Sequence, residues 1–245
     1  PVTGLFTHDE CIDLVERLIG CESEGGVMLL GLDDFSRINS LNGHAFGNTV
    51  LRMFAQSTQR LIPEGASMFR LDGDVYAIVV DGADRSAMRE LYHAIHVVAN
   101  RPHTVDDVTF FCMVSAGVAM IGQDATTAQD LLRNAENALE ESKLRGKNTM
   151  TFFSSTMTAT KLRRLEISDY MQTSVLDGMK NFELYYQPLV DAGTMGLAGA
   201  EALLRWNSDE HGQLSPVEFI PVLESYGLIG QVGRWVLEQS FAQCK

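Results

Sequence analysis

Three polar residues interrupt two apolar runs near the C-terminal end of the chain. The first run is 185–190, which contains Gln187, and the second is 199–206, which contains Glu201 and Arg205. Each run has the length of a β-strand, and the polar side chains stand at positions that would otherwise be buried. Because a buried polar group costs free energy unless it has a partner, a bound ligand or a metal ion is expected beside them.

An ion pair between Glu201 and Arg205 is the simpler alternative. In a strand, residues i and i+4 lie on the same face about 13 Å apart, which is too far for a direct contact. The spacing therefore favours a binding site over an internal ion pair.

A second group of acidic residues lies around a predicted hairpin. Asp72–Asp74 separates the apolar runs 68–71 and 75–80, and Asp-Gly is a strong indicator of a tight turn. Asp33 and Asp34 follow another buried run. These carboxylates are either metal ligands or ordinary turn residues, because aspartate favours turns for its local hydrogen bonds.

The elements that must position these residues alternate between strand and helix, which predicts an α/β fold with a helix-covered sheet. Periodicity predicts helices over 8–19, 45–61, 84–100 and 127–145, and strands over 27–32, 68–71, 75–80, 105–111 and 113–121, with the last two paired to each other. Further along, we expect a helix within 156–181, strands near 183–190 and 197–206, and helices near 216–226 and 231–244.

Composition narrows the function classes. The chain has 245 residues, which allows one or two domains, and no window reaches the ~18 consecutive apolar residues of a membrane span. A net charge of −13 disfavours non-specific binding to nucleic acid polymers or anionic membranes, so a nucleotide ligand needs local Arg, Lys or metal. The four cysteines lack metal-type spacing, which indicates reduced thiols of a cytoplasmic protein.

Five ordered motifs in the first part of the chain resemble the GGDEF diguanylate cyclases, a family of bacterial signalling enzymes. The motifs are Gly-Leu-Asp-Asp-Phe-Ser-Arg-Ile-Asn at 31–39, Gly-His-Ala-Phe-Gly-Asn at 43–48, Arg-Leu-Asp-Gly-Asp-Val-Tyr at 70–76, Ser-Ala-Gly-Val-Ala at 115–119 and Lys-Leu-Arg-Gly-Lys-Asn at 143–148. The resemblance covers residues 3–153 and implies a nucleotidyl cyclase-like domain, in which helices flank a central mixed sheet.

This copy departs from the family at the residues that the cyclase reaction uses. The cyclase holds a divalent metal at GTP with two carboxylates, and the first of these is Gly31 here. The signature Gly-Gly-Asp-Glu-Phe is replaced by residues 72–76, in which Asp74 keeps one metal ligand but Val75 cannot accept a proton. Ser36 replaces a lysine on the phosphate side. We therefore expect this half to be inactive as a cyclase.

The same resemblance still assigns nucleotide contacts. Asn39 suits a guanine edge, Asn48 replaces the aspartate that reads guanine, Lys143 is a phosphate contact, and Lys147 replaces an arginine. GTP is therefore a candidate ligand. The alternative is that Asn39 only terminates a helix and that both lysines are solvated. Residues 63–66 lack the family's Arg-x-x-Asp inhibition motif, so cyclic di-GMP is not expected to bind there.

The last part of the chain, from about residue 162, resembles the beginning of the EAL phosphodiesterases, which hydrolyse cyclic di-GMP. The resemblance makes Glu201 a catalytic residue and a ligand of Mg²⁺ or Mn²⁺, which suits a hard carboxylate oxygen. It assigns Arg205 to a phosphate and places Gln187 and Leu203 in the cyclic di-GMP cleft. The other catalytic residues of the family would lie beyond residue 245, so we expect the chain to be a piece of a longer protein.

A complete barrel of eight βα units needs about 250 residues, whereas this part supplies roughly 85, so we expect a truncated TIM-barrel-like segment of two strands and two helices. Its strands would lack their parallel neighbours and leave an apolar edge unpaired. Apolar helix residues would lose the core that they normally cover: Phe219, Ile220, Leu223, Val232, Trp235 and Val236. Exposed surface of this kind favours a homo-oligomer built through 183–245, or irregular packing of this region.

The expected organisation is a degenerate GGDEF domain over 1–155, a connecting helix over 156–181 and the N-terminal part of an EAL domain over 182–245. For the whole protein we favour a cyclic di-GMP phosphodiesterase whose inactive GGDEF half is regulatory, while the piece itself is inactive. A non-enzymatic receptor for cyclic di-GMP or GTP and a dimerisation scaffold are the alternatives. Nucleotide titrations would separate the scaffold from the other two.

Overall fold

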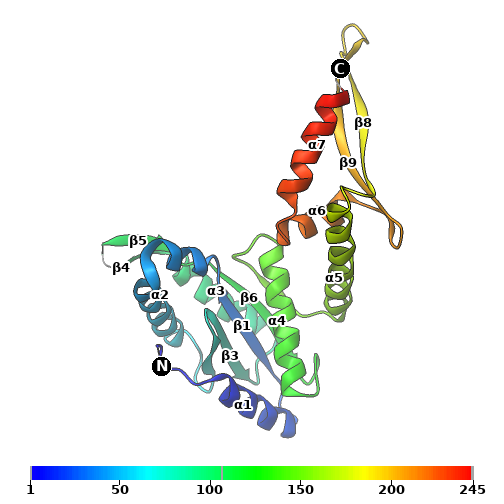
Figure 1. Cartoon of the computed structure of the whole chain (residues 1–245). Coiled ribbons are helices and arrows are strands. Elements are labelled where there is room, and N and C mark those ends of the chain that lie inside the picture. The colour runs from blue at the N-terminus through cyan, green and yellow to red at the C-terminus, as the bar shows by residue number, and fades with distance from the viewer. Residues whose placement is uncertain (1, 106, 244–245) are drawn as a thin grey trace. The chain divides into compact units, whose positions relative to one another are not determined.

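The computed structural model describes residues 2–105 and 107–243, and the chain divides into two compact units, Pro1–Thr158 and Ala159–Lys245. Helix α5 (Ser155–Leu176) contains the boundary between the units. Figure 1 shows the elements of each unit. None of the helices in the described part of the chain is long and apolar enough to cross a membrane.

A mixed sheet of five strands forms the centre of the first unit, with the order β2-β3-β1-β6-β7. The strands are β1 (Gly25–Leu32), β2 (Ser67–Asp72), β3 (Val75–Asp81), β6 (Val114–Ile121) and β7 (Met150–Phe152). Strand β1 is antiparallel to β3 and β6, and β7 is parallel to β6. All residues of β1 and β6 are buried, as expected for strands covered on both faces. The predicted mixed sheet is confirmed.

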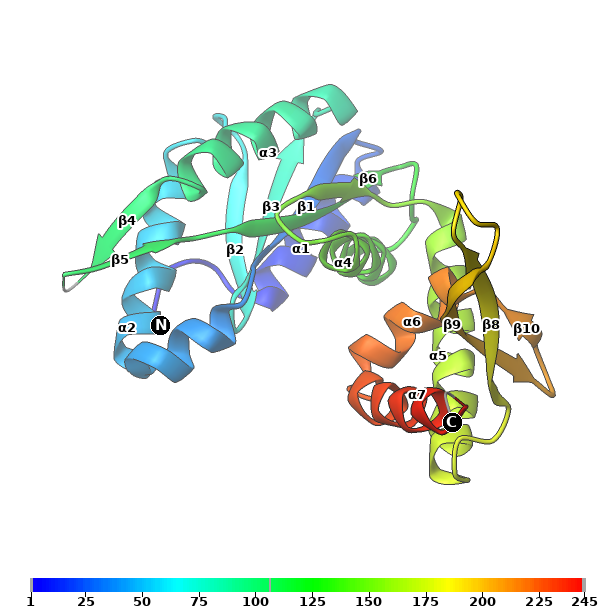
Figure 2. The same ribbon diagram turned by 90° about the horizontal axis from the view of Figure 1, so that it is seen from above.

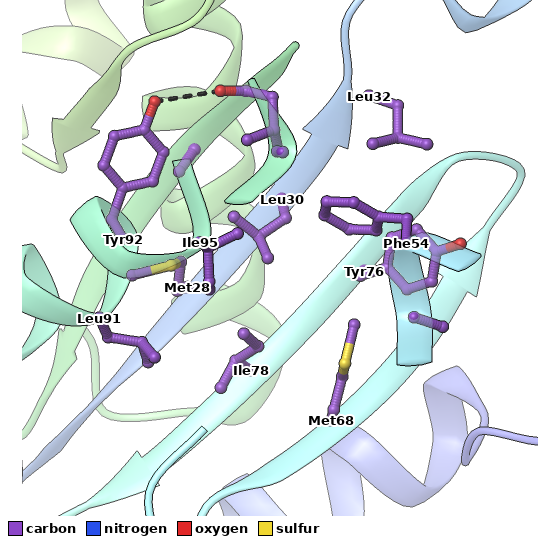
Figure 3. Packing of buried hydrophobic residues seen from close by; sticks show 14 of the residues in the cluster. Met28, Leu30, Leu32, Phe54, Met68, Tyr76, Ile78, Leu91, Tyr92 and Ile95 are labelled. Atoms are coloured by element: carbon purple, nitrogen blue, oxygen red, sulfur yellow. Dashed lines mark hydrogen bonds between the residues drawn. The ribbon is translucent and has the colours of Figure 1, made fainter. Parts of the chain in front are cut away.

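Four helices cover the two faces of this sheet: α1 (His8–Gly20), α2 (Phe35–Gln59), α3 (Arg85–Ala99) and α4 (Ala128–Leu144). Alternate side chains of a strand point to opposite faces. Met28 and Leu30 of β1 therefore pack in one cluster with α2 and α3, whereas Val27 and Leu29 pack in another with α1 and α4. Figure 2 shows α3 and α4 on opposite sides of β1 and β6, and Figure 3 shows the first cluster from close by.

Helix α2 begins earlier than the predicted start at residue 45. A kink at Gly43, with φ 82° and ψ 163°, divides it into two segments, and this backbone conformation favours glycine. The first segment, 35–42, is short and mostly exposed, so its three apolar residues Phe35, Ile38 and Leu41 give only a weak indication of a helix. This segment carries Asn39, and the second carries Asn48.

The predicted pairing of 105–111 with 113–121 is wrong. Strand β5 (Val108–Phe111) pairs with β4 (Pro102–Val105) in a separate hairpin. Strand β6 instead lies between β1 and β7. Its residues are all buried, so β6 needs hydrogen-bonding neighbours on both sides, whereas most residues of β5 are exposed and suit a peripheral hairpin.

The second unit is an antiparallel sheet with the order β10-β9-β8, packed against helices. Its elements after α5 are β8 (Phe182–Val190), β9 (Leu197–Ser208), β10 (Gly212–Leu214), α6 (Pro216–Ser225) and α7 (Ile229–Gln243). The expectation of only two strands is wrong, because β10 is a third strand, and β8 and β9 pair antiparallel with each other. The connection over 191–196 is too short for the crossover that a parallel pair requires.

Much of the apolar surface of α6 and α7 is covered within this unit, contrary to the expectation. Phe219, Leu223 and Val232 are buried together with Phe182 and Trp206, while Ile220, Trp235 and Val236 are partly buried against them. The indole N–H of Trp206 donates to Ser174 Oγ at 3.3 Å, which satisfies the polar group of this buried ring. Strand β9 and helix α5 therefore supply enough apolar surface for a local core.

Candidate functional site

Asp33 holds three segments of the first unit together. Its carboxylate accepts hydrogen bonds from Ser115 Oγ at 2.8 and 2.9 Å and from the backbone N–H of Asn148 at 2.9 Å. Asp33 is buried, and a buried carboxylate is tolerated only when it is hydrogen-bonded. The sequence left Asp33 open as a metal ligand or a turn residue; in the structure it links the end of β1 to β6 and to the segment before β7.

The turn between β2 and β3 presents two carboxylates. Gly73 adopts φ +47°, and Arg70 closes the turn by donating from Nε and Nη2 to the Gly73 carbonyl oxygen at 3.0 and 2.6 Å. Asp72 is exposed and Asp74 is half-buried. Burial raises the pKa of the Asp74 carboxyl, and the charge of Lys143 opposes that rise.

Lys143, in the last turn of α4, reaches the end of β1. A Cβ atom added to Gly31 would lie 3.0 Å from Lys143 Nζ and 3.1 Å from its Cε. The ammonium group therefore occupies the space into which a side chain at position 31 would extend. Because Lys143 also acts electrostatically on Asp74, residue 31, the β2–β3 turn and the end of α4 form one site.

A groove of about 590 Å³ passes beside this site, between α1, the β2–β3 turn and α4. Asp72, Asp74 and Lys143 line it, together with Glu136 and Glu140 of α4. Neither Asn39 nor Asn48 is part of this lining. The lining of this groove thus includes Lys143, the predicted phosphate contact, but not the two predicted guanine-side residues.

Asn39 carries a buried acceptor without a donor. Its Oδ1 atom is buried and has no hydrogen-bond partner among the described residues. A Cβ atom at residue 47 would overlap this oxygen, so only glycine fits at Gly47 without displacing the amide. A buried acceptor that stays unpaired costs free energy, so a ligand that donates a hydrogen bond would be favoured here.

Lys147, which replaces a family arginine, is not a solvated cation. Its Nζ lies 2.6 Å from Asp34 Oδ1, and both side chains are about half exposed. An exposed pair of this kind contributes about 0–1 kcal/mol, so it leaves Lys147 able to exchange partners.

The register of β8 and β9 brings the four predicted residues of the second unit to one face of the sheet. Gln187 is opposite Glu201, Tyr185 is opposite Leu203, and Arg205 is two residues further along β9. The other face carries Phe182 and Trp206 and packs on the core. The shared face results from the period of two in a strand combined with the antiparallel register.

These residues are not in buried positions, contrary to the expectation from the apolar runs. Gln187 and Glu201 are exposed, and Leu203 and Arg205 are half-buried. The face is uncovered because the helices of this unit pack on its opposite side. The Arg205 guanidinium lies 5.6 Å from the centre of the Tyr185 ring. Among the described residues Arg205 has no ion pair with Glu201, as the spacing predicted.

The metal ions that the two resembled families use are not matched by complete ligand sets. In the described part of the chain, no group of three or more His, Cys, Asp or Glu residues could hold a metal ion. Near the end of β1, opposite Val75, the position of the first ligand is Gly31, and the Lys143 ammonium group fills the adjacent space. On the β8–β9 face, Glu201 supplies one carboxylate opposite an amide.

Comparison with known proteins establishes the family. The family model described as diguanylate cyclase, GGDEF domain, matches residues 3–149. The chain belongs to the GGDEF family. The model of the EAL domain matches residues 172–245, so the GGDEF domain is followed by part of an EAL domain.

Curated relatives combine the same two domains in longer chains. The bifunctional diguanylate cyclase/cyclic di-GMP phosphodiesterase MucR of Pseudomonas aeruginosa is 27% identical over 98% of this chain and 35% of its own length. The cyclic di-GMP phosphodiesterase PdeR of Escherichia coli is 26% identical over 96% of this chain and 36% of its own. The chain therefore spans about a third of the length of these relatives.

Solved structures confirm the fold of the GGDEF half. The GGDEF domain of YfiN from Pseudomonas aeruginosa superposes with a TM-score of 0.62 at 22% identity, over 64% of this chain and 95% of that one. An EAL/GGDEF domain protein from M. capsulatus gives a TM-score of 0.51 at 30% identity, over 54% and 85%. The predicted family and fold class are thus confirmed, whereas the roles of the site residues stay predictions.

The sequence did not indicate two features of the site. One is the network of Asp33, Ser115 and Asn148, whose only sequence indication was a carboxylate directly after a buried strand. The other is the approach of Lys143 to Gly31, two residues that lie 112 positions apart in the sequence. Neither contact leaves a local pattern, because each depends on how α4 and β6 pack beside β1.

Proposed function

We propose that the whole protein is a cyclic di-GMP phosphodiesterase of the EAL type, and that its GGDEF half does not synthesise cyclic di-GMP but regulates the other half. The observation that carries this proposal is the shared face of β8 and β9, on which Gln187, Glu201, Leu203 and Arg205 stand together. A carboxylate, an amide, an apolar side chain and a guanidinium are the groups needed to bind a metal ion, a guanine base and a phosphate.

The roles in this proposal follow from the chemistry of each group. Glu201 is the ligand for Mg²⁺ or Mn²⁺, Arg205 contacts a phosphate, and Gln187 and Leu203 contact the dinucleotide. A bound divalent ion would supply charge neutralisation and an activated water. Donors from outside the described residues would have to complete its ligand set, since Glu201 is a single carboxylate.

The proposed inactivity of the GGDEF half as a cyclase rests on Gly31 and Val75. Neither residue has a side chain that binds metal or accepts a proton, and Lys143 Nζ lies beside the position of the missing carboxylate. Loss of a metal ligand removes stabilisation of developing charge on the transferred phosphate. The cytoplasmic location predicted from the cysteines belongs to the same proposal.

GTP binding by this inactive half is a second proposal, favoured by the unpaired Asn39 amide oxygen. A guanine edge offers N–H donors to such an acceptor. In this reading the GGDEF half is a nucleotide receptor, and binding of GTP is the signal that it passes to the EAL half.

The test is an assay of cyclic di-GMP hydrolysis by the full-length protein in the presence of Mg²⁺ or Mn²⁺, in which chromatography separates the substrate from the product. Glu201→Ala should abolish hydrolysis, whereas the control Glu210→Gln, in the exposed turn before β10, should leave it unchanged. The 245-residue chain should convert neither GTP nor cyclic di-GMP. Synthesis of cyclic di-GMP that Asp74→Ala removes would contradict the assignment of the GGDEF half, and hydrolysis that survives Glu201→Ala would contradict that of the EAL half.

A further inference from the structure

The charges around Gly31 form an unusual set. Asp72 and Asp74 stand on the β2–β3 turn, and Lys143 is the lysine that lines the same groove. Lys143 Nζ would lie 3.0 Å from a Cβ atom on Gly31, it lines the groove together with Asp74, and its charge lowers the pKa of the Asp74 carboxyl. The cation at this site is therefore a side chain of α4 and not a bound ion.

A divalent ion and this ammonium group compete for the same place. Mg²⁺ demands octahedral oxygen coordination, and because Gly31 adds no carboxylate to that of Asp74, a metal bound here would take most of its ligands from water and bind weakly. It would also stand close to a positive charge, and two like charges a few ångströms apart repel each other. An ammonium group carries one charge and requires no fixed set of ligands, so it suits a site with one half-buried carboxylate.

We propose that the Lys143 ammonium is the resident cation of the GGDEF half, so that this half binds neither Mg²⁺ nor Mn²⁺. The inference deepens the proposed function, because it rests on the GGDEF half being inactive as a cyclase. It replaces the prediction that Asp74 binds a metal ion. Any nucleotide that this half binds is then held without a bridging divalent ion, and its affinity is the same in Mg²⁺ and in EDTA.

Titration of Mn²⁺ into the 245-residue chain tests the proposal, with free Mn²⁺ followed by electron paramagnetic resonance. All variants carry Glu201→Ala, which removes the candidate ligand of the other half. The parent should show no saturable binding, and Lys143→Met should begin to bind Mn²⁺. The double variant Gly31→Asp/Lys143→Met should bind at least about tenfold more tightly than Lys143→Met alone, equivalent to about 1.4 kcal/mol.

Lys147→Met is the matched control, because it removes the same charge from a lysine whose partner is Asp34 rather than the Gly31 site. It should gain no Mn²⁺ binding. Circular dichroism establishes that each variant folds, and Lys143→Met alone decides the matter if the buried Gly31→Asp change prevents folding.

Saturable Mn²⁺ binding by the parent that Asp74→Ala abolishes would overturn the proposal. Equal Mn²⁺ binding by Lys143→Met, Lys147→Met and the parent would overturn it as well, since Lys143 would then not exclude the metal. Hydrolysis of cyclic di-GMP by the unsubstituted full-length protein is measured separately. If that hydrolysis is absent, the proposed function is contradicted, but the conclusion from the Mn²⁺ titrations is unaffected.

Discussion

Asn39 has a buried amide oxygen that receives no hydrogen bond from any described residue, so the proposed GTP contact and the stability of the GGDEF half both depend on this atom. Asn39→Ala should weaken GTP binding by roughly 1–3 kcal/mol, because the contact has no replacement. The free energy of unfolding without ligand should change little, since the substitution also removes an unpaired polar group. Calorimetry and urea unfolding measure the two effects.

Asn42→Ala is the control for this change, because Asn42 lies in the same helix segment and is exposed. It should leave GTP affinity unaltered. Equal affinities of Asn39→Ala and the unsubstituted chain would place the nucleotide elsewhere.

Asp33 and Asp34 are adjacent carboxylates with opposite environments, and they make a matched pair for substitution. Asp33→Asn should lower the free energy of unfolding by roughly 1–3 kcal/mol, because an amide N–H₂ would face the Ser115 and Asn148 donors. Asp34→Asn breaks only the exposed pair with Lys147 and should cost about 0–1 kcal/mol. Urea unfolding of both variants tests the difference, and equal losses would mean that the buried network contributes no more than the surface pair.

Sequence reasoning placed most candidate residues but not their partners. The identities of Gly31 and Val75 were enough to predict an inactive cyclase, since neither side chain binds metal or accepts a proton, while Asp74 was expected to keep one metal ligand; both stay predictions. The position of the Lys143 ammonium group beside Gly31 depends on how segments far apart in the sequence pack, and no local sequence pattern indicates this. The burial of Gln187 and Glu201 was mispredicted because apolar runs do not reveal which face of a sheet is covered.

At the scale of elements, the two segments of α2 depend on one backbone position. Gly43 has φ +82°, so Gly43→Ala should destabilise the GGDEF half by roughly 1 kcal/mol or more. Asn39 and Asn48 lie on either side of the kink, so straightening α2 should also weaken GTP binding. Thermal unfolding and calorimetry provide the two measurements.

Gly233→Ala is the comparison for Gly43→Ala, because Gly233 lies in the interior of α7 without a positive φ and with no atom within 4 Å of an added Cβ. This change should stabilise by roughly 0.5–1 kcal/mol, as expected for alanine in a helix interior. A stabilising Gly43→Ala would show that the kink is not retained.

Periodicity predicted most helices and strands of both units, because each has a covered face that imposes a regular apolar spacing. Periodicity failed for strands whose place in a sheet is decided by hydrogen-bonded pairing rather than by burial of one face. The hairpin of β4 and β5 was missed since its residues are mostly exposed, and the three-residue β10 is too short to show a pattern.

For the whole molecule, buried cysteine thiols and tyrosine hydroxyls predict a fall in the free energy of unfolding at alkaline pH. Burial raises the pKa values of the Cys11 and Cys112 thiols from 9.0 to about 12, and it also raises those of the Tyr76 and Tyr92 hydroxyls. Above pH 9.0 the unfolded chain loses these protons first, so the native state binds more protons and its stability falls as pH rises.

The slope should reach about 1.4 kcal/mol per pH unit for each such group. Urea unfolding at a series of alkaline pH values measures it. A free energy of unfolding that stays constant above pH 9.0 would contradict the raised pKa values of these buried groups.

The reactivity of the thiols should follow their burial. The exposed Cys21 should react with iodoacetamide at neutral pH, while Cys11 and Cys112 react only on unfolding. Cys244 lies outside the described residues.

Self-association is the remaining expectation for the whole chain. Leu189, Val190 and Leu197 are 52%, 57% and 75% exposed on β8 and β9, next to the predicted EAL residues. We expect a dimer built through 183–245, because contact between such faces removes apolar surface from water. Light scattering over a concentration series should show it, and a chain ending near residue 153 should remain monomeric. A monomer at high concentration, with 183–245 resistant to proteolysis, would exclude the dimer.

The Asp33 network also has a consequence for how the GGDEF half folds. Asp33 is separated from Ser115 by 82 residues and from Asn148 by 115 residues. Loops of this length close at an entropic cost that contacts repay only once both ends are in place. We therefore expect the network to form after the folding transition state, so that it slows unfolding without accelerating folding. The carboxylate that joins the end of β1, strand β6 and the segment before β7 would then stabilise the native state kinetically, by slowing its unfolding.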